Sequence, residues 1–270
     1  MKLSIGGIAA IVAVCLGLGL GPAAFGGTAE GRAALQAGDF ATALRELGAA
    51  ARGGDPGAQN LYATMLKDGR GLGAPDGAAA VAWYRRAAEA GNVDAELNLG
   101  YMLFHGEGAP RDRETGLRWY EKAADAGLPA AQYNVAKVYW DADGVPRDPD
   151  RARKLFQAAA EQGLPEAQFG LGVALLNAPE PDAAAAFNWF SRAARQGEGP
   201  ASAKLAGMYL LGKGIDKDPV AAQTWALIGE AAGDPLAAQL RMKLETDLTP
   251  EQNAQARAQA AAFRPRPEHP

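Results

Sequence analysis

Few residues of this chain belong to the types that carry out catalysis or bind metals. The 270 residues contain only two histidines, His105 and His269, and a single cysteine, Cys15. His105 stands in the segment His-Gly-Glu-Gly beside Glu107, and no second histidine or cysteine lies near it in the sequence. A protein zinc site needs three or four such ligands. We therefore interpret His105 as a polar turn residue and predict no metal site, no cofactor and no catalytic residue.

Aspartates and glycine-rich turns are the other candidates for chemistry. Asp112, Asp148 and Asp218 could be considered as carboxylates for acid–base catalysis. They recur at one place of a repeating pattern and precede helical stretches, which is typical of N-cap residues. The Gly-x-Gly pairs, such as Gly106 and Gly108, follow helical stretches, whereas a nucleotide-binding glycine loop follows a strand. The sequence therefore predicts that the protein is not an enzyme.

A repeated unit accounts for most of the chain. Six aligned segments, spaced by 37, 36, 36, 34 and 36 residues, begin at Gly54, Gly91, Gly127, Gly163, Gly197 and Gly233. An alanine stands four places after each of these glycines. A fixed period of this length is the sequence signature of repeat solenoids. We predict an all-α fold, a right-handed α-solenoid of stacked helix pairs.

Each unit is predicted to form two helices. A small residue at the ninth place, such as Gly100 in the second unit, would let the second helix approach the first. The second helix would bury an aromatic residue and an alanine pair. The aromatic residues assigned to this stripe are Trp83, Trp119, Phe156, Trp189 and Trp225.

The unit resembles a known repeat. The segment AELNLGYMLFHGEGAPRDRETGLRWYEKAADAG, from Ala95 to Gly127, resembles the Sel-1-like repeat, a relative of the tetratricopeptide repeat. Five units are assigned to residues 54–90, 91–126, 127–162, 163–196 and 197–232. The fourth has lost two residues and its Gly-x-Gly turn, so we expect its loop to differ. The resemblance implies an adaptor or regulator of protein complexes, without shared catalytic residues.

The ends of the chain differ from the repeats. Residues 1–26 carry one charge, Lys2, before an apolar run, and Ala24-Phe25-Gly26 is a possible cleavage site. This pattern predicts a cleaved signal peptide and a periplasmic or secreted protein. The alternative is an inner-membrane anchor formed by uncleaved residues 5–25. Residues 27–53 and 233–263 are predicted to be capping helices, and 264–270 a disordered tail.

One face of the first helices is more apolar than stacking requires. The sixth, tenth and thirteenth places of the three central units hold Leu97, Tyr101, Phe104, Tyr133, Lys137, Trp140, Phe169, Val173 and Leu176. These nine residues, here called the strip, either line a concave groove or seal neighbouring repeats together. A groove would suit another protein or peptide of the envelope.

Partner classes can be narrowed further from composition. The net charge of −4 and the absence of a basic run argue against nucleic acid. We expect a monomeric scaffold or regulator, with no membrane insertion once the signal is removed. The alternative is a protein that binds envelope glycan or peptidoglycan, or a cell-wall hydrolase-like enzyme.

Overall fold

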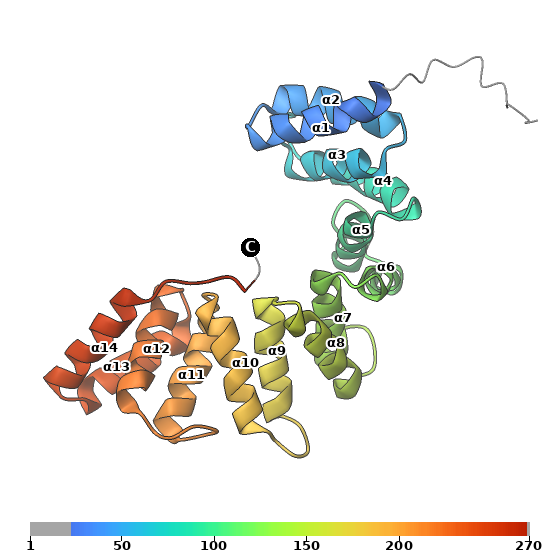
Figure 1. The fold of residues 1–270 in the computed structure, drawn as a ribbon. Helices are drawn as coiled ribbons and strands as arrows, with labels where there is room; N and C mark the ends of the chain where they lie inside the picture. Colours follow the sequence, from blue (N-terminus) through green and yellow to red (C-terminus); the bar gives the residue numbers. More distant parts are fainter. Residues whose placement is uncertain (1–22, 269–270) are drawn as a thin grey trace, which may run out of the picture.

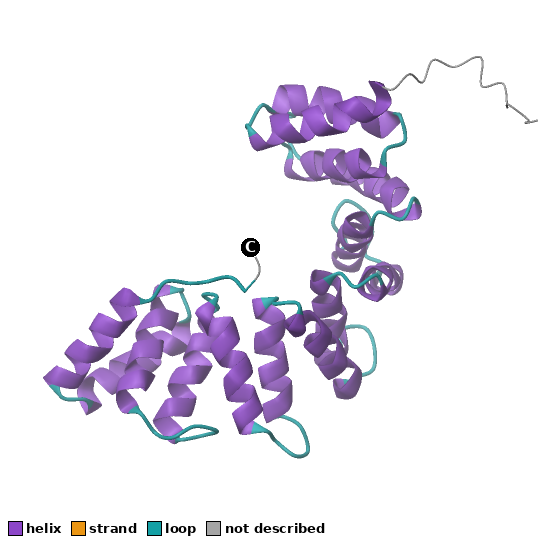
Figure 2. Ribbon diagram, viewed as in Figure 1, coloured by secondary structure: helices purple, strands orange, loops and turns teal. Residues whose placement is uncertain are grey.

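The protein is built from helices stacked in sequence order. The computed structural model describes residues 23–268, which form fourteen α-helices and no strand (Figures 1 and 2). The helices are α1 (Ala23–Gln36), α2 (Phe40–Arg52), α3 (Pro56–Asp68), α4 (Gly77–Glu89), α5 (Val93–His105), α6 (Arg113–Asp125), α7 (Pro129–Asp141), α8 (Pro149–Glu161), α9 (Pro165–Leu176), α10 (Ala183–Arg195), α11 (Gly199–Leu211), α12 (Pro219–Ala231), α13 (Pro235–Asp247) and α14 (Pro250–Ala262).

From α1 to α13 each helix packs on the next one along the chain. The stack bends midway, so that α1–α8 and α9–α14 form two arms (Figure 1). The predicted all-α solenoid is thereby confirmed. Within the described part of the chain, no helix is both long and apolar enough to cross a membrane.

The second helix of each repeat begins at an aspartate that caps it. The Asp112 carboxylate accepts a hydrogen bond from the Thr115 backbone N–H at 3.0 Å, which lowers the pKa of Asp112. The same bond is made by Asp76, Asp148, Asp182 and Asp218. Each cap satisfies an amide that has no partner inside its helix. The interpretation of these aspartates as caps is confirmed.

The Gly-x-Gly turn after α5 needs glycine at both places. Gly106 and Gly108 have φ angles of 79° and 72°, in the left-handed region where side chains are disfavoured. A Cβ on Gly108 would also lie 2.2 Å from the Gly77 carbonyl oxygen, so this turn abuts the preceding repeat. In the fourth repeat the C-cap of α9 is instead Asn177, with φ −103°. The shortened loop therefore differs, as expected.

In α4, α6 and α10 the buried aromatic residue lies one position after the predicted tryptophan. Tyr120 is 2% exposed, whereas Trp119 is only half-buried. Successive helical residues point about 100° apart. Tyr120 therefore faces its own repeat, while Trp119 packs against the core of the preceding one.

The same offset occurs in α4 and α10. Tyr84 and Phe190 are fully buried beside Trp83 and Trp189, and Phe156 of α8 is 4% exposed. The predicted stripe groups Phe156 with the tryptophans. In the structure, however, the tryptophans are the seventh residues of their helices, and the seventh residue of α8 is Leu155. The predicted stripe was therefore wrong by one residue at Trp83, Trp119 and Trp189 but correct at Phe156, and the alanine pairs beside it are buried as expected.

The amino-terminal helices α1 and α2 pack on each other and on α3. They occupy the segment assigned to a capping pair, with α1 starting at Ala23. The predicted signal peptide lies outside the described residues over positions 1–22.

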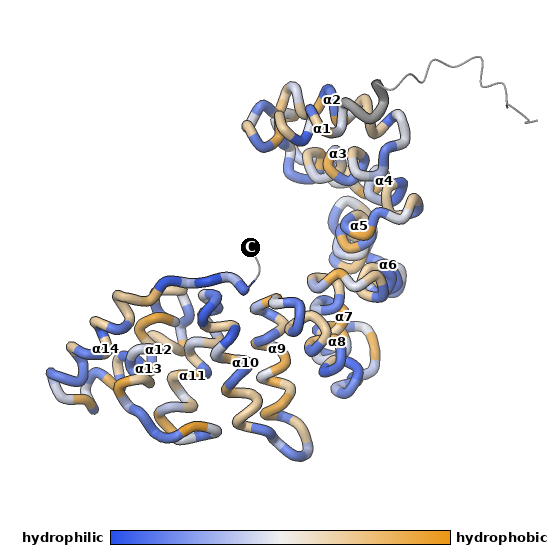
Figure 3. Tube along the Cα trace, in the orientation of Figure 1, coloured by the Kyte–Doolittle hydropathy of each residue, from blue (hydrophilic) through white to orange (hydrophobic). Residues whose placement is uncertain are grey.

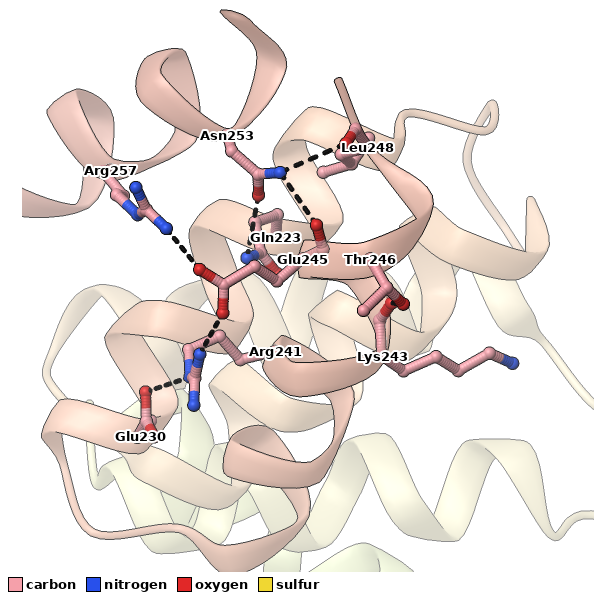
Figure 4. A network of polar contacts seen from close by, with 9 residues as sticks. All are labelled: Gln223, Glu230, Arg241, Lys243, Glu245, Thr246, Leu248, Asn253 and Arg257. Carbon is pink, nitrogen blue, oxygen red and sulfur yellow. Dashed lines mark hydrogen bonds and ion pairs between the residues drawn. The ribbon is translucent and has the colours of Figure 1, made fainter. Parts of the chain in front are cut away.

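The last two helices close the other end of the stack. Thr249 and Gln252 form a reciprocal capping box at the start of α14. This helix packs mainly on α12. Figure 4 shows the polar contacts that hold it: Glu245 of α13 pairs with Arg257 of α14 and with Arg241, and Asn253 of α14 accepts from the Gln223 amide. The end of the solenoid is thus tied down by polar groups.

The carboxyl-terminal segment differs from the prediction of a disordered tail. Residues 264–268 form a hydrophilic extended chain that runs from α14 back towards α10 (Figures 1 and 3). The Arg266 backbone N–H donates to the Arg195 carbonyl at 2.9 Å, and the Glu268 carboxylate pairs with Arg192. Prolines prevent a helix here but leave the chain free to dock in extended form.

Candidate binding pocket on the first helices of the central repeats

A cavity opens between α5, α6 and α7. Its volume is about 270 Å³. Its lining residues are Tyr101, Phe104, His105, Tyr120, Tyr133, Asn134, Lys137, Val138, Asp141 and Asp143. The cavity therefore combines an aromatic floor with a rim of groups that can form hydrogen bonds.

The floor is rigid because its members also belong to the core. Phe104 is 3% exposed and its ring centroid lies 5.9 Å from that of Tyr120. Gly100 makes this contact possible, since a Cβ there would lie 2.8 Å from Cδ1 of Tyr120. Small residues at the ninth place thus admit the second helix, as predicted.

Tyr101 stands at the mouth of the cavity. Its side chain is 40% exposed, and its ring lies 4.5 Å from that of His105, centroid to centroid. Hydrogen bonding with Glu107 raises the pKa of Tyr101. The hydroxyl therefore stays protonated at neutral pH, and its proton is donated to the Glu107 carboxylate.

The opposite wall comes from α7 and carries charge. Lys137 and Asp141 form an ion pair one turn apart, and this contact raises the pKa of Lys137. Asp143 is paired with Arg113 of α6 at 2.8 Å. Burial raises the pKa of Tyr133 beside them. The rim thus offers both charges, each already balanced by a neighbour.

The structure divides the strip among three environments. Tyr101, Phe104, Tyr133 and Lys137 share the cavity. Leu97 packs against the core cluster that contains Phe104.

The remaining strip residues lie elsewhere. Trp140 contacts Phe156 and borders a separate depression beside Arg147 and Pro179. Phe169, Val173 and Leu176 pack against the cluster that surrounds Phe190. The strip is therefore part pocket and part seal between repeats.

Six of the ten lining residues, among them Val138 of α7, lie outside the predicted strip. Asn134 and Asp141 lie on α7 outside the three places that define the strip, and Asp143 follows the helix. Tyr120 was hidden by the one-residue error in the aromatic stripe. His105 was interpreted as a turn residue, yet it is the last residue of α5 and lines the cavity. No group of three or more metal-ligating side chains occurs among the residues that the structure describes.

The repeats match a known family along most of their length. The Sel1 repeat model matches residues 56–92, 93–128, 129–164, 165–198 and 199–234. The chain belongs to the Sel1 repeat family. Sel1 repeats form scaffolds that typically mediate protein–protein interaction. No curated protein matches the chain.

Two solved structures resemble this Sel1 repeat protein over most of its length. One is a protective antigen of uropathogenic Escherichia coli strains with an SLR fold, at 30% identity and a TM-score of 0.77, covering 82% of this chain and 48% of the antigen. The other is a Sel1 repeat protein from Oxalobacter formigenes, at 26% identity and a TM-score of 0.75, covering 87% of this chain and 98% of that one. This chain thus spans about half the length of the E. coli antigen.

Proposed function

We propose that this Sel1 repeat protein is a non-enzymatic scaffold or regulator of the bacterial cell envelope that binds a segment of another protein in the α5–α7 pocket. The observation that carries the proposal is the exposed Tyr101 ring above a rigid aromatic cavity. Tyrosines dominate many binding interfaces because they offer a large contact area at low entropic cost. The pocket beneath the Tyr101 ring can take up a side chain of the partner, and binding hot spots are typically formed around such pockets.

The size of the cavity favours a side chain as its occupant. Its 270 Å³ lies below the roughly 300–1,000 Å³ of sites for drug-sized ligands and cofactors. One apolar or aromatic side chain of a partner would fill it. The Asn134 amide and the Lys137–Asp141 pair would then contact the partner's polar groups.

The envelope location rests on the sequence of residues 1–26. A single positive charge, an apolar run and small residues are the parts of a secretory signal. Amino-terminal sequencing of the native protein should begin near Gly27. A soluble cytoplasmic form that retains Met1 would contradict export.

A glycan is the second candidate ligand. Tyr101 and Tyr133 present aromatic faces beside the Asp141 carboxylate and the Asn134 amide, which are groups that also bind sugars. Binding of the purified protein to peptidoglycan and to defined glycans distinguishes this candidate from a protein partner.

The central experiment is site-specific crosslinking. A photoreactive amino acid at Tyr101, introduced in the native envelope, should crosslink to one segment of one protein. A synthetic peptide of that segment should bind the purified wild type, and Tyr101→Ala should weaken this binding by about 1–3 kcal/mol. Leu211→Ala removes a more exposed apolar side chain far along the stack and serves as the control. An equal loss of peptide affinity in both variants, or no loss in Tyr101→Ala, would refute the pocket as the binding site.

A further inference from the structure

Three repeats carry a tryptophan and a cation at the same two places of their second helix. The tryptophan is the seventh residue of the helix and the cation is the tenth. The pairs are Trp83–Arg86 in α4, Trp119–Lys122 in α6 and Trp189–Arg192 in α10. Each cation lies over the indole ring, at 4.5, 4.9 and 4.4 Å from its centroid. Stacking of this kind holds the charged group in place before an anion arrives.

The fourth residue of the facing first helix completes each arrangement. It is Gln59 in α3, Glu96 in α5 and Gln168 in α9, with exposures of 7%, 2% and 0%. The amides of Gln59 and Gln168 donate to a carbonyl of the preceding second helix, at 3.1 and 3.3 Å. In the middle repeat the Lys122 amine reaches the equivalent carbonyl, that of Ala88, at 3.5 Å. The three places are therefore built alike.

In two of the three places a carboxylate is present. Glu96 supplies it in the α5–α6 pair, where its Oε1 lies 2.7 Å from Nζ of Lys122. In the α9–α10 pair the tail supplies it. There Arg192 donates to both carboxylate oxygens of Glu268, at 2.8 and 2.5 Å, and the Gln168 amide donates to one of them at 2.8 Å.

The tail is also held through its backbone. The Glu268 N–H donates to Oε1 of Gln196 at 3.1 Å. The tail thus shows how this arrangement binds a glutamate in an extended segment, through the side-chain carboxylate and through the backbone N–H of the same glutamate.

The α3–α4 pair has the same glutamine, tryptophan and arginine without a carboxylate. Arg86 forms no ion pair with any residue that the structure describes, and the buried Oε1 of Gln59 has no donor there. In the α9–α10 pair the matching oxygen accepts from Gln196 at 2.9 Å. Ala90 stands at the place of Gln196, so the Gln59 oxygen is left for a donor from outside. An unpaired buried acceptor costs free energy that such a donor would recover.

We infer that Gln59, Trp83 and Arg86 form a binding site for a glutamate within an extended segment of a partner protein. The carboxylate pairs with Arg86 and accepts from the Gln59 amide, as Glu268 does with Arg192 and Gln168, and a second N–H of the segment takes the place of the Gln196 donor at the Gln59 oxygen. The chain's own tail is docked at α10, in the other arm of the bend (Figure 1). The inference is independent of the α5–α7 pocket.

The test uses the full chain with isotope-labelled tryptophan and a synthetic peptide of residues 263–270 as the extended glutamate probe. The indole N–H resonance of Trp83 should shift and saturate as the peptide is added. The resonance of Trp119 should stay in place, because Glu96 already fills that site. A peptide carrying Glu268→Gln should bind about tenfold more weakly, since it loses the charge-assisted hydrogen bonds.

Two matched variants complete the test. Arg86→Met keeps an apolar stem on Trp83 and removes the guanidinium, so peptide affinity should fall about tenfold. Lys122→Met makes the same change where the site is filled and should leave the Trp83 shift intact. If Arg86→Met unfolds, the comparison of the two peptides on wild type decides the question. No shift at Trp83, a shift at Trp189 alone, or equal binding of both peptides would overturn the site.

Discussion

The α5–α7 and α8–α10 regions use the same repeat, yet one leaves a pocket and the other is closed. The sixth residue of α7 is Asn134, which lines the pocket. The sixth residue of α9 is Gly170, where a Cβ would lie 2.7 Å from the Phe156 ring. The ring of Phe169 packs 5.6 Å from that of Phe190. Side-chain volume on the facing helices therefore decides whether a strip residue meets solvent or core.

The largest expected effect lies in the closed region. Phe190 is fully buried and contacts Phe169, so Phe190→Ala should lower the free energy of unfolding by about 3–5 kcal/mol. Urea denaturation measures this. Trp189→Ala, at the half-buried neighbouring place, should cost less. A larger loss of stability in Trp189→Ala than in Phe190→Ala would mean that the tryptophan belongs to the core, as the sequence predicted.

Alkaline pH should destabilise the first arm, α1–α8, more than the second arm, α9–α14. Burial raises the pKa of Tyr84 from 10.0 to about 12 and also raises that of Tyr120, whereas Phe156 and Phe190 hold the same place further along. A raised pKa means that the neutral hydroxyl is favoured in the folded state. Its contribution is complete below pH 10 and is lost as the pH rises through about 12.

For Tyr84 this loss amounts to roughly 2–3 kcal/mol. The free energy of unfolding, measured in urea as the pH rises, should fall more for the wild type than for Tyr84→Phe. That variant gives up the hydroxyl contact with Thr64, at 2.9 Å, at every pH. Parallel pH profiles for the two proteins would contradict the assignment of this alkaline loss to the Tyr84 hydroxyl.

Adding volume to α9 should show what keeps that region closed. Gly170→Asn gives α9 the residue found in α7, and its side chain would collide with the Phe156 ring. Overpacking of this kind costs about 1–3 kcal/mol, measurable as a lower thermal midpoint. Asn134→Ala on α7 removes a pocket-lining group without adding volume and should cost less. An unchanged midpoint for Gly170→Asn would mean that Phe156 moves aside freely.

The smallest effect on stability is expected at the open pocket. Tyr101→Ala removes a side chain that is 40% exposed, so the free energy of unfolding should change by less than about 1 kcal/mol. Binding of the crosslinked partner segment should nevertheless weaken by the amount proposed above. If Tyr101→Ala melts as early as Phe190→Ala, Tyr101 belongs to the core.

Much of the fold could be predicted because it follows from local rules. The helix starts are set by aspartates such as Asp112, which bonds an amide three residues away. Helix ends are set by glycines such as Gly106, whose φ is accessible to few other residues. The period of the repeat then places the small residue Gly100 opposite Tyr120.

The sequence by itself therefore determined the helices and their stacking order. Tertiary structure alone decided which of two adjacent aromatics is buried, since Trp119 and Tyr120 differ only in which neighbouring helix they face. It also decided where the strip opens, which depends on ring packing such as that of Phe156 on Gly170. The docking of Glu268 on Arg192 was likewise decided by the tertiary structure. Such contacts join residues distant in the chain, and their energies depend on the volumes and charges that the fold brings together.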